Sequence, residues 1–445
     1  MQRPEDRSRT GPEALVERLG DLTEGPKLLP TVVAFGAEAV GPLELMVRGP
    51  SDVLFQPRCL AADALAIIGS RDARQALVRA LRDSGSRRLE PVLDLSERAV
   101  INCIARHLGR MGDVACADAI LEVFAARRAP GCARALGWLG DTRAVPLMIQ
   151  CLRDDMARDE VMEALASLGP KAEPALCRAL ISRPDGEQAE APTSVSARAA
   201  IAAILGRVGT RACTLALTWA LWDEEQEVRF AAALALCERF GPAAIPTAAE
   251  TLIDALGARD WSRAQQAFEA LQADVSCVID RLTPHVRRWP VDDSGKRRKL
   301  LVVDLLGRVP TEDACRALAS LSDDPDSGVR ARAAQAISAA LETSPQVAEA
   351  LKAFQRDPSP TVRLILARAL PRINPLDRSL AATMLTDSDA HVRKTASVMI
   401  HRRGREAEPL LRELAQAPHR YVDGLWASVR VRTAAERLLA ELHIP

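Results

Sequence analysis

Arginine recurs near the ends of predicted helices, where it could bind an anionic partner. Such helix-end arginines are Arg110 in GRMG, Arg207 in GRVG, Arg239 in ERFG, Arg308 in GRVP, Arg372 in PRIN and Arg402 in HRRG. If the helices stack in register, these side chains form one row, which Arg332, Arg368 and Lys394 would widen. A basic row of this kind attracts an acidic protein segment or a phosphate backbone. The alternative is local, because a cation in the last turn of a helix also interacts favourably with the helix dipole.

Residues for catalysis or metal binding show no recognisable pattern. The sequence contains no GxGxxG, P-loop, HExxH or GxSxG motif. The six histidines are far from any plausible second ligand in the sequence; they are His107, His285, His391, His401, His419 and His443. The ten cysteines form no CxxC or Cys/His cluster and are interpreted as free thiols in a reducing compartment. We therefore expect no catalytic residue, no metal site, no cofactor and no enzymatic activity.

The elements that would position the arginines repeat along the chain. Five segments contain an aspartate followed six residues later by an arginine: Asp52 and Arg58, Asp223 and Arg229, Asp324 and Arg330, Asp357 and Arg363, and Asp387 and Arg393. From Arg229 to Arg430, arginines that each precede an Ala/Leu-rich helical pattern follow one another at steps of 34, 34, 33, 33, 30 and 37 residues. This spacing is the period of a two-helix unit in a repeat protein.

Glycine and proline mark the junctions between these units. Four examples begin at Gly36, Gly140, Gly169 and Gly241, and each places a proline in the first turns of the following helix. Glycine tolerates the left-handed conformation at a helix end, and proline costs little in a first turn. Neither helix of a unit can bury its apolar face alone, so neighbouring units must stack. The sequence predicts an all-α fold, a right-handed α-solenoid of about twelve helical hairpins.

The pattern Gly-Asp-x-Arg-Ala-Val-Pro-Leu at Gly140, with the Asp-x5-Arg segments and the Ala/Leu-rich helices, resembles the HEAT-repeat family. The similarity is to its PBS-lyase HEAT-like subtype and extends from about Pro12 to Leu442. The resemblance implies that the five Asp/Arg pairs form a ladder of side chains between successive units. Units around Ala129, Arg198 and Arg297 lack the spaced aspartate, so the ladder is expected to weaken there.

Composition limits the compartment and the partner. Basic and acidic residues balance at 59 each, which argues against duplex nucleic acid or an anionic membrane as the main partner. Residues 1–11 are polar and are expected to be a disordered segment without signal-peptide character, followed by one continuous repeat array over 12–445. Free thiols and the absence of a long apolar run favour a cytoplasmic protein, and the arginine-rich composition indicates a bacterial source of high GC content.

Three irregular segments interrupt the repeats. Insertions between the two helices of a unit are expected at 84–96, which has enough leucine and valine to dock a partner, and at 182–196, which is acidic and expected to be disordered. The segment 285–299 combines six Lys/Arg residues with Trp289. It would serve either as a phosphate-contacting loop or, as Asp292 and Asp293 favour, as a solvated turn with a capping tryptophan.

Three functions are compatible with these features. The first is a non-enzymatic scaffold or adaptor that binds a partner protein, expected to offer an acidic segment, on the concave face or at the 84–96 insertion. The second is a nucleic-acid-binding protein similar in fold to the HEAT-like DNA glycosylases, with exposed tryptophans among Trp219, Trp222, Trp261 and Trp289. The third is a bilin lyase or isomerase subunit, which only the name of the repeat subtype suggests.

Overall fold

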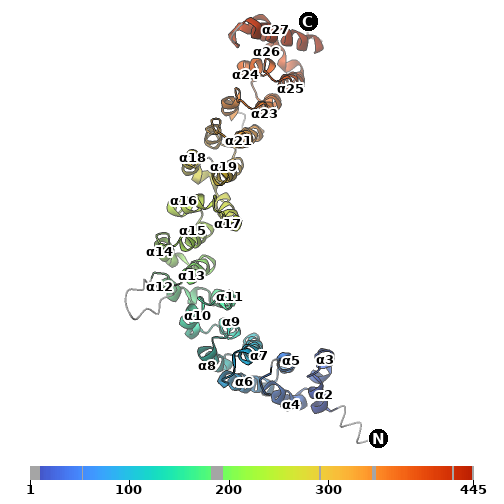
Figure 1. The fold of residues 1–445 in the computed structure, drawn as a ribbon, viewed down its shortest axis with the longest axis vertical. Helices are drawn as coiled ribbons and strands as arrows, with labels where there is room; N and C mark the ends of the chain where they lie inside the picture. Colours follow the sequence, from blue (N-terminus) through green and yellow to red (C-terminus); the bar gives the residue numbers. More distant parts are fainter. Residues whose placement is uncertain are drawn as a thin grey trace. The chain divides into compact units, whose positions relative to one another are not determined.

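The structure is a computed structural model that describes residues 11–52, 54–181, 194–289, 292–342, 347–422 and 425–442. Within these ranges every regular element is a helix. The chain divides into two compact units, Met1–Ala235 and Leu236–Pro445, called here the N-terminal and C-terminal units. Figure 1 shows each unit as a row of paired helices. The all-α solenoid predicted from the repeat period is confirmed.

The N-terminal unit consists of short helices joined by tight turns. They are α2 (Pro12–Arg18), α3 (Gly25–Ala34), α4 (Ala37–Val47), α5 (Gln56–Ile68), α6 (Arg71–Ser86), α7 (Pro91–Met111), α8 (Ala117–Arg127), α9 (Pro130–Leu139), α10 (Val145–Cys151), α11 (Arg158–Leu168), α12 (Glu173–Ile181), α13 (Val195–Val208) and α14 (Thr214–Ala220). Helix α15 (Gln226–Phe240) begins in this unit.

The C-terminal unit repeats the same arrangement. Its helices are α16 (Pro246–Ala255), α17 (Trp261–Gln272), α18 (Ile279–Arg288), α19 (Asp293–Leu306), α20 (Glu312–Ala319), α21 (Ser327–Ala340), α22 (Ala348–Leu351), α23 (Pro360–Ala369), α24 (Arg378–Leu385), α25 (Ala390–His401), α26 (Glu408–Gln416) and α27 (Leu425–Glu441).

Within each unit the helices form two layers. Even-numbered helices contact one another in sequence, as α4 contacts α6, and odd-numbered helices do the same, as α5 contacts α7 and α23 contacts α25. The even-numbered helix is therefore the first of each hairpin and the odd-numbered helix the second. The buried side chains between the layers are mostly alanine, leucine, valine and isoleucine, and burying each large aliphatic side chain contributes about 1.5 to 3 kcal/mol.

Glycine ends several second helices, as the junction pattern predicts. Gly112 follows α7 with φ of 69° and Gly140 follows α9 with φ of 73°, both in the left-handed region that favours glycine. Proline stands near the start of the next first helix at Pro146 in α10. Turn and helix start are thus set by residue types that the sequence shows directly.

The segment 84–96, where an insertion is expected, is mostly helical. Residues up to Ser86 complete α6, and residues from Pro91 onward extend the N-terminus of α7 to a helix of 21 residues. Val92 and Leu95 are exposed on that extension. Of the second expected insertion, residues 182–193 lie outside the described ranges, while Ser194 caps α13.

The segment 285–299 is also mainly helical. Residues up to Arg288 belong to α18 and residues from Asp293 belong to α19. Trp289 is buried, with Arg298 stacked over its ring, so it is not available to stack on a base. Among the described residues no helix has the length and apolar character needed to cross a membrane.

Candidate functional site

The aspartate and arginine side chains of the C-terminal unit connect successive hairpins. Arg330 on α21 donates two hydrogen bonds to the carboxylate of Asp357 in the next hairpin, at 2.7 and 3.1 Å. Arg363 on α23 binds Asp387 in the same way, at 2.7 and 2.9 Å. Lys299 donates to Asp324 at 2.5 Å. The carboxylate partner of each cation thus comes from the following hairpin.

Within a single hairpin, the aspartate and arginine interact through the main chain. The Nη1 atom of Arg330 donates to the backbone carbonyl of Asp324, and Nη1 of Arg363 donates to that of Asp357. The aspartate carboxylate also accepts a backbone N–H two residues later, which shapes the turn, as in Ser359 to Asp357 at 2.8 Å. Each pair therefore fixes its own turn and the contact to its neighbour.

The N-terminal unit has the same type of contact with different residues. Arg198 donates two hydrogen bonds to Asp223, at 2.9 and 3.0 Å, although the ladder was expected to weaken there. Arg229 donates to the backbone carbonyls of Asp223 and Glu224. In the C-terminal unit, the cation that pairs with Asp324 is Lys299, two residues after the Arg297 expected from the repeat spacing.

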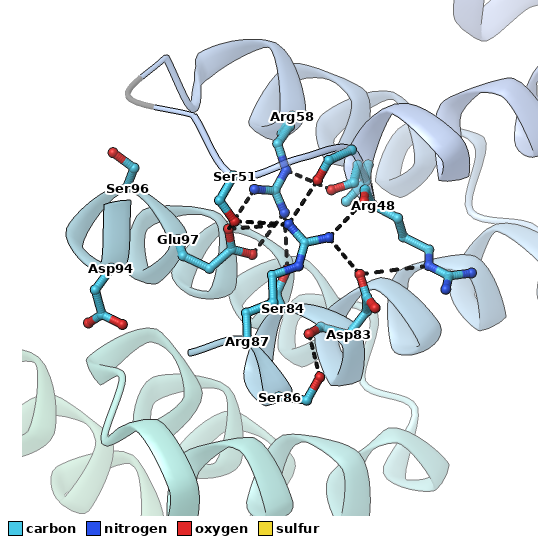
Figure 2. A network of polar contacts seen from close by, with 12 residues as sticks. Arg48, Ser51, Arg58, Asp83, Ser84, Ser86, Arg87, Asp94, Ser96 and Glu97 are labelled. Atoms are coloured by element: carbon cyan, nitrogen blue, oxygen red, sulfur yellow. Dashed lines mark hydrogen bonds and ion pairs between the residues drawn. The ribbon is translucent and has the colours of Figure 1, made fainter. Parts of the chain in front are cut away.

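Arg58 is paired with Glu97 on α7 and not with a turn aspartate. Figure 2 shows the two side chains facing each other within a polar cluster, where Arg58 donates to both carboxylate oxygens at 2.6 and 2.8 Å. Ser51 donates to Glu97 at 2.7 Å, and Arg58 also donates to Ser84. The Glu97 side chain is fully buried. Burial alone raises the pKa of Glu97, but the bonds to Arg58, Ser84 and Ser51 outweigh it and lower the pKa to about 2.

The helix-end arginines do not form an unbroken row of free cations. Three arginines of the predicted row or of the residues that would widen it make ion pairs with acidic residues of the preceding second helix or its end: Arg207 with Glu163, Arg332 with Asp304 and Arg372 with Glu342. Two others lie over aromatic rings, Arg110 over Trp138 and Arg308 over Phe268. Arg239, Arg368 and Arg402 are exposed. A continuous basic stripe is therefore reduced to a few positions.

Family models match four segments of the chain. The model described as HEAT repeats matches residues 186–272 and 291–371, and the model described as PBS lyase HEAT-like repeat matches residues 57–83 and 131–154. Both kinds of match agree with the hairpins and with the Asp/Arg contacts. The chain contains HEAT repeats. No curated protein sequence matches it.

Solved structures with related HEAT-repeat folds have low sequence identity. A homology model of the full-length AP-3 complex is 11% identical in sequence. The match covers 99% of this chain and 90% of that chain, with a TM-score of 0.42. A crystal structure of importin beta is 12% identical; the match covers 97% of this chain and 67% of that chain, with a TM-score of 0.45. The complex of CpcE and CpcF of phycocyanin lyase from Nostoc sp. PCC7120 is 21% identical; the match covers 60% of this chain and 95% of that chain, with a TM-score of 0.27. At these values the likeness carries no argument about function.

One groove lies between the second helices α25 and α27 at the end of the HEAT-repeat ladder. Its volume is about 930 Å³. Its lining includes the basic residues Arg393, Lys394, His401, Arg402, Arg430 and Arg437. Glu441 is the acidic residue of the lining, and it lies 3.7 Å from Arg437 and 3.9 Å from His401. The groove thus collects Arg402 and Lys394 of the predicted stripe with four further basic side chains.

Arg393 differs from the equivalent arginines of the preceding HEAT repeats. Its Nη1 atom donates to the carbonyls of Asp387 and Ser388, as Arg330 and Arg363 do with their own turns. The edge formed by Nε and Nη2, which binds a carboxylate in Arg330 and Arg363, has no carboxylate partner among the described residues. Arg393 lines the groove. Within the described ranges, the last arginine of the ladder thus lacks the bidentate carboxylate contact of its counterparts, and it lies among the other cations of the groove.

The expectation that every histidine lies apart from a second ligand is wrong for His107. Its Nε2 atom lies 2.6 Å from Oδ1 of Asp63, and Sγ of Cys103 lies 3.7 Å from the same oxygen. A hydrogen bond with Cys103 lowers the pKa of the Cys59 thiol. The sequence carried a signal that the motif search missed, because Cys59 and Asp63 are four residues apart on α5, and Cys103 and His107 are four residues apart on α7.

Three of the tryptophans named in the nucleic-acid hypothesis are exposed. Trp219, Trp222 and Trp261 have exposed fractions of 62%, 70% and 55%. Trp219 lies with the exposed Leu215 on one face of α14, a first helix. Trp222 lies between α14 and α15, and Trp261 begins the second helix α17, so the three tryptophans do not share one layer.

Proposed function

We propose that this HEAT-repeat protein is an interaction scaffold that binds an acidic segment of another protein in the groove between α25 and α27. The observation that carries the proposal is the set of contacts that Arg393 makes, compared with those of the equivalent arginines. Its counterparts Arg330 and Arg363 each hold a carboxylate from the next hairpin with their Nε and Nη2 atoms. Among the described residues no carboxylate fills this position for Arg393, so a carboxylate from a partner would complete it.

The other cations of the groove extend this site beyond one residue. Lys394 and Arg402 lie on or next to α25, while Arg430 and Arg437 lie on α27. A segment with several aspartates or glutamates could pair with both walls of the groove. Charge complementarity of this kind contributes to specificity and association rate, and it weakens with salt where the charges are exposed.

A protein partner fits the groove better than nucleic acid. The buried Trp289 is removed from the set of possible base-stacking residues, and the exposed Trp426, near the start of α27, is not among the residues that line the groove. The charges of the whole chain balance at 59 basic and 59 acidic residues. We infer a non-enzymatic binding role, with the carboxylate as the recognised group.

The test is binding of a fluorescent peptide rich in aspartate and glutamate, measured by anisotropy with the full chain. A peptide of the same length with asparagine and glutamine is the matched ligand control. We expect the acidic peptide to bind and the neutral peptide to bind at least about tenfold more weakly, with an affinity that falls as salt increases. The groove variant Lys394→Glu/Arg402→Glu/Arg437→Glu should lose most of the binding.

The control variant is Arg239→Glu/Arg368→Glu, which reverses the charge of two exposed arginines of second helices that lie outside the groove lining. It should bind the acidic peptide within about twofold of the wild type, less than the 1.4 kcal/mol that a tenfold change represents. Equal loss in both variants would show a general charge effect and contradict the groove. Tighter binding of a single-stranded oligonucleotide than of the acidic peptide would favour the nucleic-acid hypothesis instead.

A further inference from the structure

The contact between α5 and α7 gathers four side chains that are common zinc ligands. Cys59 and Asp63 lie one turn apart on α5, and Cys103 and His107 lie one turn apart on α7. Residues four apart project from the same face of a helix, and the two helices pack against each other. The two pairs therefore face each other across one helix contact, far in sequence from the groove of the C-terminal unit.

The ligand atoms are close enough to share one ion. The carboxylate oxygen of Asp63, the Sγ atom of Cys103 and a ring nitrogen of His107 all lie within 4.8 Å of one another. In tetrahedral zinc sites with bond lengths of about 2.0 to 2.3 Å, ligand atoms are separated by about 3.3 to 3.8 Å. The 3.7 Å between Cys103 Sγ and Asp63 Oδ1 lies in that range. The 2.6 Å between Asp63 and His107 needs only a small opening.

The arginines next to the cluster in sequence do not bind its carboxylate, because each binds a glutamate elsewhere. Arg58 precedes Cys59, but its guanidinium is bound to Glu97. Arg106 precedes His107, and it donates two hydrogen bonds to Glu160 at 2.9 and 3.1 Å. The hydrogen-bonding partners of the Asp63 carboxylate are instead Cys103 and His107. Its charge is thus directed at the two potential ligands of α7.

The type of donor selects the ion. Thiolate and imidazole favour zinc over calcium or magnesium, which prefer oxygen ligands. A carboxylate oxygen is also a regular zinc ligand. The side chain of Asp63 is 40% exposed and that of His107 is 20% exposed, so an ion can reach the cluster from solvent.

We propose that Asp63, Cys103 and His107 bind a zinc ion, and that Cys59, which lies outside this group of three but whose backbone oxygen is 3.8 Å from Sγ of Cys103, supplies the fourth ligand. Such an ion would link the second helices of two successive hairpins, α5 and α7. It would do so close to the buried Arg58 and Glu97 pair, which joins the same two helices. The site is independent of the groove proposed for partner binding.

Zinc binding is tested with the full chain, purified without a histidine tag and kept reduced. Zinc is titrated in competition with a chromophoric chelator, and cobalt is substituted to read the coordination geometry. We expect one tightly bound zinc ion per chain, a cobalt spectrum of a tetrahedral site with thiolate ligands, and a higher unfolding temperature with zinc. The absence of a stoichiometric ion would overturn the proposal.

The ligands are tested one at a time, with circular dichroism to show that each variant is folded. His107→Gln, Cys103→Ser and Asp63→Asn should each weaken zinc binding by at least about tenfold, as for the loss of groups that hold a metal. Matched controls are His391→Gln, at an exposed histidine, and Cys277→Ser, at a cysteine of the C-terminal unit. These controls should keep the wild-type affinity.

Two further results decide the role of the cysteines. Cys59→Ser should also lose about tenfold or more in affinity and change the thiolate absorption of the cobalt form; unchanged binding would remove Cys59 from the ligand set and overturn the four-ligand site. If mass spectrometry of the untreated chain shows a Cys59–Cys103 disulfide, and the reduced chain binds no zinc, the cluster is a redox pair and the proposal is wrong.

Discussion

The two units of the molecule link their hairpins with the same kind of ion pair, but only the N-terminal unit shows, among the described residues, a buried pair whose carboxylate lies on a second helix. In the C-terminal unit, Arg330 and Arg363 each bind an aspartate in the turn of the next hairpin. In the N-terminal unit, Arg198 binds the turn aspartate Asp223 in the same way, whereas Arg58 binds Glu97, which lies on a second helix. A buried guanidinium needs a carboxylate from the next hairpin, because leaving a buried charge unpaired costs several kcal/mol. The comparison teaches that this need is constant while the residue that meets it changes.

The approach of successive second helices differs between the units as well. In the N-terminal unit, a Cβ atom added to Gly109 would lie 2.7 Å from Cα of Ala135, and one added to Gly137 would lie 2.7 Å from the backbone oxygen of Ala164. In the C-terminal unit, the corresponding contact of Gly307 is to Cβ of Ala336 at 3.1 Å. At these positions the glycine of the N-terminal unit lies against the backbone of the next second helix, whereas the glycine of the C-terminal unit lies against a side chain at a larger distance.

The largest effect is expected from neutralising the buried carboxylates. Glu97→Gln leaves Arg58 buried without a charged partner, and it should destabilise the contact between α5 and α7 by about 3 to 5 kcal/mol. Asp357→Asn leaves Arg330 in the same position and should cost a similar amount. Urea unfolding gives the loss of stability, and hydrogen exchange locates it at α5 and α7 in the first variant and at α21 and α23 in the second.

A matched control for this pair of variants is Glu163→Gln. Glu163 pairs with Arg207 where both side chains are about half exposed, so its loss should cost less than about 1 kcal/mol. If Glu97→Gln were no more harmful than this control, the helix-borne glutamate would not be equivalent to the turn aspartate, and the comparison of the two units would fail.

Acid should weaken the Glu97 contact by a predictable amount. The pKa of Glu97 is lowered from its ordinary value of 4.5 to about 2 in the folded chain. A carboxylate with a lowered pKa stabilises the fold above its unfolded pKa, and this contribution, about 3 kcal/mol here, is lost as the pH falls from about 4.5 towards 2. The stability difference between wild type and Glu97→Gln, measured by urea unfolding across this range, should therefore shrink with falling pH. A difference that stayed constant would contradict a charged Glu97 in the folded state.

The sequence predicts the fold because its signals are local and repeated. The period of the arginines, the glycines at helix ends and the prolines in first turns each follow from the conformations that those residues allow. The 84–96 segment differs from the expected insertion for a related reason. Residues 91–96 continue the helical pattern of α7, so the extra length relative to neighbouring repeats lengthens a helix.

The sites were less predictable because they depend on contacts between hairpins. The Asp-x5-Arg spacing is visible in the sequence, but the carboxylate that Arg330 binds lies 27 residues later. The pairing of Arg58 with Glu97 joins positions 39 residues apart that share no motif. Likewise, the cluster of Asp63, Cys103 and His107 arises only when α5 and α7 pack with matching faces. A search for repeated spacing alone cannot find such contacts, whereas pairing i and i+4 positions on adjacent second helices can.

The smallest of the expected effects tests the helix approach itself. In Gly137→Ala the new methyl group meets the backbone of Ala164 at 2.7 to 3.1 Å, so α9 and α11 must move apart, at a cost of about 1 to 3 kcal/mol. In Gly307→Ala the methyl group meets the Ala336 side chain and the Val303 backbone oxygen at 3.1 Å. Less movement is needed there, and the lower entropy of alanine in the unfolded chain offsets part of the strain, so a change below about 1 kcal/mol is expected. Urea unfolding of both variants measures the difference; equal losses would mean that glycine at this position is not what sets the closer packing of the N-terminal unit.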